Sequence, residues 1–122
     1  MEWKIELIFV PVTDVDRTKE FFERIGWNAD HDQRVGDELR FVQMTPPGSA
    51  CSIAFGTGMD SKVPVGTFDV VQLVIPDADE ALAHLKSVGV EAEGVDELAW
   101  GRFVRFADPD GNQWTLQELP AR

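Results

Sequence analysis

The stretch Trp100–Glu118, WGRFVRFADPDGNQWTLQE, has two runs rich in aromatic and β-branched residues on either side of Asp108–Asn112, DPDGN. The carboxylates, amide and glycine of DPDGN suit either an ion-binding loop or a turn. A calcium loop needs ligands at alternate positions and a terminal glutamate. In a turn, proline presets the φ of one residue and glycine accepts a positive φ. We therefore predict a hairpin turn between the last two strands.

The residues around this turn belong to an internal repeat. The turn has a counterpart at 46–50, PPGSA, between two further extended runs. Matching residues lie 63 positions apart in the two halves, and the pairs are Asp14 and Asp77, Gly26 and Gly89, and Gly48 and Gly111. Self-similarity at a fixed spacing is typical of a repeated structural unit. The chain is therefore predicted to contain two copies of one module.

Each module is predicted to begin with a strand and a helix. The strands are the short apolar runs at 5–12, IELIFVPV, and at 69–76, DVVQLVIP. Asp77 is expected to cap the second helix, and Thr13 or Asp14 the first. A glycine follows each helical segment, where a left-handed C-terminal cap is expected.

Three further strands are expected after each helix, which makes each module β-α-β-β-β. They cover about 27–35, 38–45 and 50–56 in the first half, and about 90–95, 101–107 and 113–119 in the second. Gly36-Asp37 is expected to form a two-residue hairpin turn. A chain of 122 residues can bury roughly two-thirds of its unfolded surface. We expect one α+β domain over 1–122, with module one at about 1–57, a joint at about 58–67 and module two at about 68–119.

The composition disfavours several classes of partner. The net charge is −11, from 22 acidic and 11 basic residues, so nucleic-acid phosphates and anionic membrane surfaces would be repelled. A cationic small molecule is compatible with this charge, although acidic surfaces more often serve solubility. No apolar run approaches the roughly 20 residues of a membrane span. The start, MEWKIELIFVPVTD, lacks the pattern of a signal peptide, so we expect a cytoplasmic protein.

The modules, with VPVTDVDRTKEFFERIGW at 10–27, VIPDADEALAHLKSVGVE at 74–91 and the stretch Trp100–Glu118, resemble the vicinal oxygen chelate superfamily. This is the superfamily of glyoxalases, bleomycin-resistance proteins and extradiol dioxygenases. The resemblance implies that the two modules form a U-shaped, incomplete barrel around a cavity, commonly in a homodimer. Metal-dependent members hold one divalent ion there, through a His or Gln from the first strand of a module and a Glu from its last strand.

The positions that the resemblance assigns to metal ligands carry unsuitable side chains. Leu7 and Val70 occupy the first-strand position, and Ser52 and Thr115 the last-strand position. Aliphatic groups cannot coordinate a metal, and hydroxyls alone are poor ligands for transition metals. A register shift of one residue would turn strand side chains to the other face. Four residues outside the expected positions have side chains that could coordinate a metal, and they are Glu6, Asp69, Glu118 and His31. We expect no metal or other cofactor, and we assign no catalytic residue.

Strand alternation predicts which side chains line the cavity. These are Leu7, Phe9, Ser52, Ala54, Val70, Gln72, Val74, Gln113, Thr115 and Gln117. Burying an unpaired amide costs a few kcal/mol, so the glutamines are candidates for ligand contact, unless they bond to one another or to water. Trp100 is a candidate for stacking on a flat ligand, with core or lid packing as the alternative. The predicted ligand-binding residues are Phe9, Gln72, Trp100, Gln113, Thr115 and Gln117.

The remaining polar residues point less clearly to a site. Arg102 and Arg105 are expected to share one face of their strand, where they hold an anionic ligand group or pair with surface carboxylates. His31 lies in a polar strand, and His84 is expected to be exposed on the second helix. None of these residues forms a recognisable nucleophile and base.

Three classes of function remain open. The first is a metal-independent small-molecule-binding protein of the bleomycin-resistance type that sequesters an aromatic or cationic compound. The second is a glyoxalase- or dioxygenase-like lyase or isomerase with a divergent or absent metal site. The third is a partner-binding or regulatory module. Fold alone does not choose among them. We favour binding, because the ligands of the superfamily's metal are missing and no other catalytic group replaces them.

Overall fold

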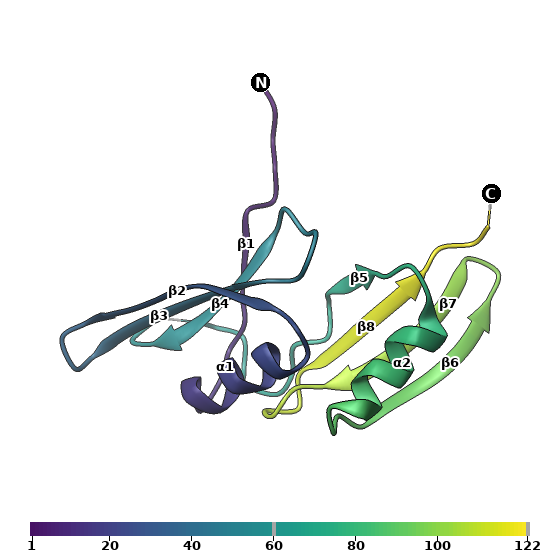
Figure 1. The fold of residues 1–122 in the computed structure, drawn as a ribbon. Coiled ribbons are helices and arrows are strands. Elements are labelled where there is room, and N and C mark those ends of the chain that lie inside the picture. The colour runs from purple at the N-terminus through teal and green to yellow at the C-terminus, as the bar shows by residue number, and fades with distance from the viewer. Residues whose placement is uncertain (60, 122) are drawn as a thin grey trace. The chain divides into compact units, whose positions relative to one another are not determined.

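Each half of the chain folds into a four-stranded sheet with one helix packed against it (Figure 1). The computed structural model describes residues 1–59 and 61–121. The halves form two units, Met1–Gly66 and Thr67–Arg122, with a boundary inside the predicted joint. The α+β class and the repeated β-α-β-β-β order are confirmed. Within the described residues, neither helix is long and apolar enough to cross a membrane.

The first unit contains one helix and four strands. They are β1 (Leu7–Phe9), α1 (Val15–Arg24), β2 (Asn28–Val35), β3 (Leu39–Thr45) and β4 (Ser52–Thr57). The sheet order is β1-β4-β3-β2, with β1 parallel to β4 and the other neighbours antiparallel. The predicted two-residue turn is wrong, because Val35 pairs with Leu39 and three residues lie between them.

The second unit repeats this arrangement. Its elements are β5 (Gln72–Val74), α2 (Ala78–Ser87), β6 (Ala92–Leu98), β7 (Gly101–Ala107) and β8 (Gln113–Glu118), with the sheet order β5-β8-β7-β6. The first strand of each unit is shorter than predicted. It lies at a sheet edge and pairs over three residues with one parallel neighbour, so the flanking apolar residues form no ladder.

The helix boundaries follow the predicted capping residues. The Asp14 side chain accepts a hydrogen bond from the backbone N–H of Arg17 at 3.0 Å, and Asp77 accepts one from Glu80 at 3.1 Å. An aspartate at this position satisfies an N–H group that has no partner within the helix. Of the two caps considered for the first helix, the structure has Asp14.

The core of each unit lies between its helix and one face of its sheet. In the first unit, the ring of Phe22 on α1 stacks on that of Trp27, with 4.7 Å between the ring centroids. The centroid of Phe22 lies 6.3 Å from that of Phe55 on β4. In the second unit, Val104 and Trp114 are fully buried, and α2 contacts β6, β7 and β8. Burial of such side chains is the main stabilising contribution, at roughly 1.5–3 kcal/mol each.

A buried arginine connects the helix of the first unit to its sheet. Arg40 of β3 is 8% exposed. It donates to Asp16 of α1 at 2.7 Å and to both carboxylate oxygens of Asp32 on β2, at 3.0 and 2.9 Å. Lys19 of α1 also donates to Asp32, at 3.0 Å. The hydrogen bonds from Arg40 hold the pKa of Asp32 well below its usual range, against a smaller opposing effect of desolvation.

The second unit has an arginine in the matching place. Arg102 of β7 pairs with Asp79 of α2 at 3.0 Å, with Glu97 of β6 at 3.1 Å and with Glu118 of β8 at 3.3 Å. Glu118 also accepts the backbone N–H of Ala78 at the start of α2, at 2.8 Å. The internal repeat contained a signal for both contacts, because an aspartate at the second helical position and an arginine on the third strand recur in each module.

The ion pair of Asp32 predicts a pH-dependent stability. The pKa of Asp32 is lower in the folded state than its ordinary value of 3.8. Its contribution to the free energy of unfolding is therefore fully present above pH 3.8 and is lost as the pH falls through the folded-state pKa. The side chain is 26% exposed. Allowing for solvent screening, we expect the destabilisation caused by Asp32→Asn to shrink by about 1 kcal/mol between pH 6 and pH 2.5. Urea unfolding at both pH values measures it.

The exposed Asp37 in the β2–β3 turn provides the control for this prediction. Asp37→Asn should change the free energy of unfolding by less than about 0.5 kcal/mol at either pH. An equal effect of Asp32→Asn at both pH values would show that the ion pair is not the source of the dependence.

The DPDGN stretch is a hairpin turn, as predicted. Ala107 at the end of β7 pairs with Gln113 at the start of β8. The carboxylate of Asp108, 5% exposed, accepts hydrogen bonds at 2.9–3.2 Å from two backbone N–H groups, from Asn112 Nδ2 and from Trp114 Nε1. Both carboxylate oxygens are therefore occupied by donors of the protein itself, which gives the turn a structural role.

Candidate functional site

Four of the predicted ligand-binding residues lie on one face of the second sheet. We call this face, opposite α2, the open face. The register pairs Gln72 of β5 with Thr115 of β8, and Val74 with Gln117. On the other side of β8, Gln113 pairs with Ala107 of β7. Residues paired across neighbouring strands point to the same side of a sheet. The expected alternation in this module therefore agrees with the register, and it places Gln72, Gln113, Thr115 and Gln117 on the same face.

Two of these glutamines form a hydrogen-bonded chain that we call the amide relay. Gln72 Nε2 donates to Gln117 Oε1 at 2.6 Å, and Gln117 Nε2 donates to the backbone carbonyl of Trp100 at 2.8 Å. The alternative that the glutamines bond to one another therefore holds for this pair. Gln113 donates to the carbonyl of Gly111 at 3.3 Å, within its own turn.

Exposed apolar side chains lie at the end of the open face where the relay ends. We call them the apolar rim, and they are Val74, Leu98, Trp100 and Leu119, exposed by 61, 50, 62 and 44%. Leu98 pairs with Gly101, which leaves Trp100 in the turn between β6 and β7. An indole exposed to this extent is not part of the core of its unit. A hydrogen-bonded amide pair next to exposed apolar side chains suits a ligand that has both polar and apolar groups.

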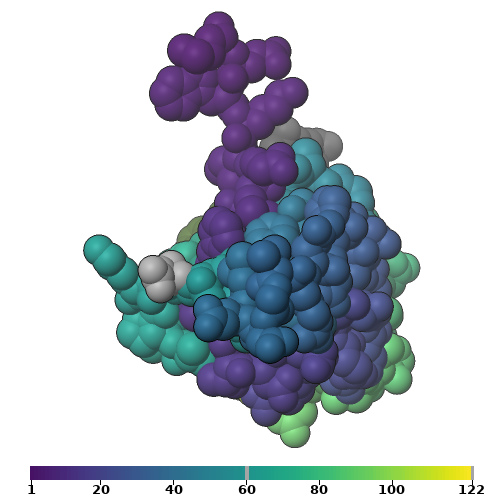
Figure 2. All heavy atoms as spheres, turned by 90° about the vertical axis from the view of Figure 1, so that its left-hand side faces the viewer, coloured from purple at the N-terminus to yellow at the C-terminus, as the bar shows by residue number. Residues whose placement is uncertain are grey.

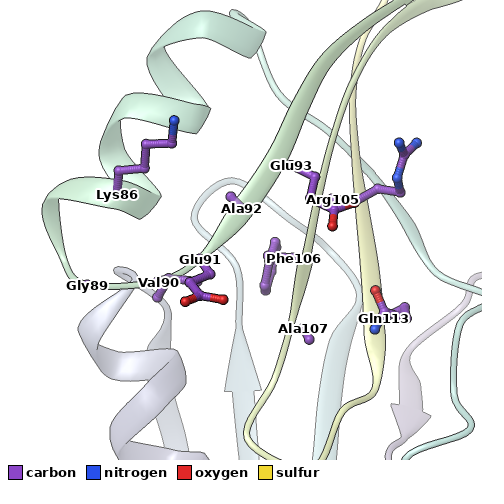
Figure 3. Close-up of a pocket in the computed structure, with 10 residues that line it drawn as sticks. All are labelled: Lys86, Gly89, Val90, Glu91, Ala92, Glu93, Arg105, Phe106, Ala107 and Gln113. Atoms are coloured by element: carbon purple, nitrogen blue, oxygen red, sulfur yellow. The ribbon is translucent and has the colours of Figure 1, made fainter.

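A hollow of about 640 Å³ lies at the other end of the second sheet (Figure 3). Lys86 of α2 borders it on the helix side, and Gln113 of β8 on the strand side. Its other charged lining residues are Glu91, Glu93 and Arg105. Of the predicted ligand-binding residues it includes only Gln113. The hollow thus has mixed charge and lies apart from the relay.

The prediction that Arg102 and Arg105 share a face is wrong. They are three positions apart, and side chains an odd number of positions apart along a strand point to opposite faces. Arg102 lies on the helix side with Asp79 and Glu118, whereas Arg105 pairs with Asp96 of β6. Each arginine therefore has a carboxylate partner, as the alternative interpretation expected.

The corresponding face of the first unit carries fewer of the predicted residues. Phe9 of β1 pairs with Ala54 of β4 and is 54% exposed. It borders a hollow of about 210 Å³. Further along this sheet, Thr45 bonds to Asp30 and lies 2.6 Å from the hydroxyl of Ser52. The hydrogen bonds from Thr45 and Asn28 lower the pKa of Asp30.

Comparison with known proteins identifies the family. The chain matches the Glyoxalase/Bleomycin resistance protein/Dioxygenase superfamily over residues 4–116. The chain belongs to this superfamily. The fold and turn motifs that suggested the resemblance were therefore sufficient to recognise it.

Solved structures of superfamily members are similar over nearly the whole chain. TnmS3, an antibiotic binding protein from Streptomyces sp. CB03234, is 31% identical, with a TM-score of 0.86 and 98% of both chains covered. A glyoxalase/bleomycin resistance protein from the same organism is 32% identical, with a TM-score of 0.81. The match covers 94% of this chain and 100% of the other. The uncharacterized protein YetH of Bacillus subtilis is 26% identical over 120 residues, which cover 94% of this chain and 98% of YetH.

The donor set at the positions of the superfamily's metal does not fit a divalent ion. Leu7 pairs with Ser52 in the first unit, and the corresponding residues of the second unit are Val70, which precedes β5, and Thr115 of β8. Glu118 lies on the opposite face, bonded to Arg102 and to the start of α2. In the described part of the chain, no three His, Cys, Asp or Glu side chains are grouped so that they could hold a metal.

Proposed function

We propose that the protein binds, and so sequesters, a small organic molecule with a flat apolar part, without a metal. The contact surface is the open face of the second sheet around Gln72, Thr115 and Gln117. The observation that carries this proposal is the amide relay beside the apolar rim. A few oriented polar groups among apolar side chains are the usual composition of a small-molecule site. TnmS3, which is similar over 98% of its length, is described as an antibiotic binding protein.

The charge of the protein bears on the class of ligand. A net charge of −11 attracts cations over a Debye length of about 8 Å at physiological salt. Aromatic cations therefore belong to the proposed ligand class together with neutral aromatic compounds. Exposed indoles such as Trp100 bind both, through stacking and through cation–π attraction.

The proposal also includes a homodimer, as the resemblance implied, and a location in the cytoplasm. Exposed apolar side chains on the first six residues support self-association. Trp3 and Ile5 are 84 and 73% exposed on an N-terminal segment without regular structure (Figure 2). Burial against a second chain would remove Trp3 from water.

Thermal melts of chelator-treated protein test the proposal. Proflavine, a planar cation, and 2-naphthol, a planar neutral compound, serve as probes. Saturable binding of either probe raises the free energy of unfolding by about 2.7 kcal/mol at a hundredfold excess over Kd, which corresponds to several degrees in Tm. Trp100→Ala should weaken binding about tenfold, whereas Trp100→Phe retains most of the affinity because the aromatic ring remains. Equal binding by wild type and Trp100→Ala would exclude this face as the site.

A further inference from the structure

The direction of the amide relay is set by its last member. The backbone carbonyl of Trp100 can only accept a hydrogen bond, so the group 2.8 Å away on Gln117 must be the donor Nε2. The oxygen of the same amide then faces Gln72. Because Gln117 Oε1 can only accept, Gln72 must turn its own Nε2 toward it, at 2.6 Å.

Close packing prevents Gln117 from reversing this order. Gln117 is 7% exposed, and its side chain lies against Gly101. A Cβ atom on Gly101 would be 2.8 Å from Gln117 Nε2 and 3.0 Å from its Cγ, so only a glycine leaves room for the amide in this position. A flipped amide would place its oxygen against the Trp100 carbonyl and lose that hydrogen bond.

The direction of the relay determines which atom Gln72 presents at the exposed end. Gln72 is exposed on β5, which is a sheet edge. Its Nε2 is directed to Gln117, so its Oε1 is the acceptor left for a molecule on the open face. Val74 lies two positions along the same strand and therefore on the same side, exposed by 61%. A fixed acceptor thus stands next to apolar surface.

We propose that the ligand carries a hydrogen-bond donor, a hydroxyl or N–H group, on the flat apolar part that contacts Trp100. Gln72 Oε1 accepts this hydrogen bond. Gln117 is a positioning residue, because it fixes both the direction of the Gln72 amide and the backbone that carries Trp100. This inference rests on the proposed function and deepens it, since it selects among flat aromatic molecules by one polar group.

Two probes that differ in one donor test the inference. 2-Naphthol has a hydroxyl donor and is neutral at pH 7, whereas 2-methoxynaphthalene has the same ring system and no donor. Calorimetric titration of the full chain gives both Kd values, and the indole N–H signal of Trp100 in NMR spectra reports whether the ring contacts it. We expect the wild type to bind 2-naphthol about fivefold more tightly, the worth of one net hydrogen bond.

Two variants separate recognition from positioning. Gln72→Met removes the acceptor, so the two probes should bind this variant with equal affinity. Gln117→Met releases both Gln72 and the Trp100 turn, so both probes should bind more weakly and the Trp100 signal should broaden. Gln72 is exposed, so its variant decides the matter even if Gln117→Met does not fold.

The outcomes distinguish this inference from the proposed function. Equal binding of both probes by the wild type, or a preference for 2-naphthol that persists in Gln72→Met, overturns the inference and leaves small-molecule binding intact. Failure of the wild type to bind either probe at millimolar concentration overturns both.

Discussion

Replacing Asp108 by alanine is expected to lower the free energy of unfolding by about 3–5 kcal/mol, because a buried, fully bonded charge is removed. Asp108 accepts hydrogen bonds from the backbone N–H groups of Asp110 and Asn112, both at 3.0 Å. It also accepts them from Asn112 Nδ2 at 2.9 Å and from Trp114 Nε1 at 3.2 Å. Alanine would leave buried donors without a partner, beneath a fully buried indole. Urea unfolding followed by far-ultraviolet circular dichroism measures the loss.

The effect should extend beyond the turn. Asn112, fully buried, accepts the backbone N–H of Phe68 through its side-chain oxygen at 3.2 Å. The carbonyl of Phe68 in turn accepts the N–H of Gln113 at 2.7 Å. The turn therefore holds the chain that leads into β5, and through it the edge strand that carries Gln72. We expect Asp108→Ala to weaken ligand binding as well as stability.

The matching turn of the first module supplies a control for Asp108. Ser49 is exposed, and the hydrogen bonds that the structure gives for its side chain are to the backbone of Cys51, two residues away. Ser49→Ala should cost less than about 1 kcal/mol. If Asp108→Ala cost no more than this control, the four hydrogen bonds would not have the structural role described for them.

Replacing Gly56 by alanine is expected to cost about 3 kcal/mol or more, because β3 and β4 must separate to admit a methyl group. An added Cβ would lie 1.8 Å from the carbonyl oxygen of Arg40 and 2.8 Å from its carbon. Both are backbone atoms, so no side-chain rotation relieves the overlap. Moving this carbonyl also disturbs the Arg40 side chain that pairs with Asp16 and Asp32. Thermal and urea unfolding should both report the loss.

Gly48 is the matched control for Gly56. A Cβ at Gly48 would meet no atom within 4 Å, although its φ of +79° lies in the left-handed region. Gly48→Ala should therefore cost about 1 kcal/mol from backbone strain alone. A similar cost at both glycines would show that β4 adapts to the methyl group without loss of pairing.

The elements that could be predicted from the sequence are those determined by local chemistry. Asp14 and Asp77 mark helix starts because short acidic side chains satisfy N-terminal N–H groups. The order of elements followed from the repeat. The lengths of β1 and β5 did not, because apolar residues flanking an edge strand look the same in sequence whether or not they pair.

The candidate site could be predicted only in outline. Alternation along β8 placed Thr115 and Gln117 on one face, and the register agrees. The amide relay could not be predicted from the sequence. It depends on the backbone carbonyl of Trp100, which lies in the turn between β6 and β7 and approaches Gln117 of β8. Arg102 and Arg105 are three positions apart, so strand alternation assigns them to opposite faces, contrary to the prediction that they share one.

The central claim is that this superfamily member binds an organic ligand without the metal of its catalytic relatives. The most direct measurement is calorimetric titration of chelator-treated protein with 2-naphthol, alone and with manganese(II), iron(II), cobalt(II), nickel(II) or zinc(II). We expect the same Kd within about twofold in every case, because the ligand contacts Gln72 and Trp100 and no metal. Binding that occurs only with one of these metals, or is at least about tenfold tighter with it, would contradict the account.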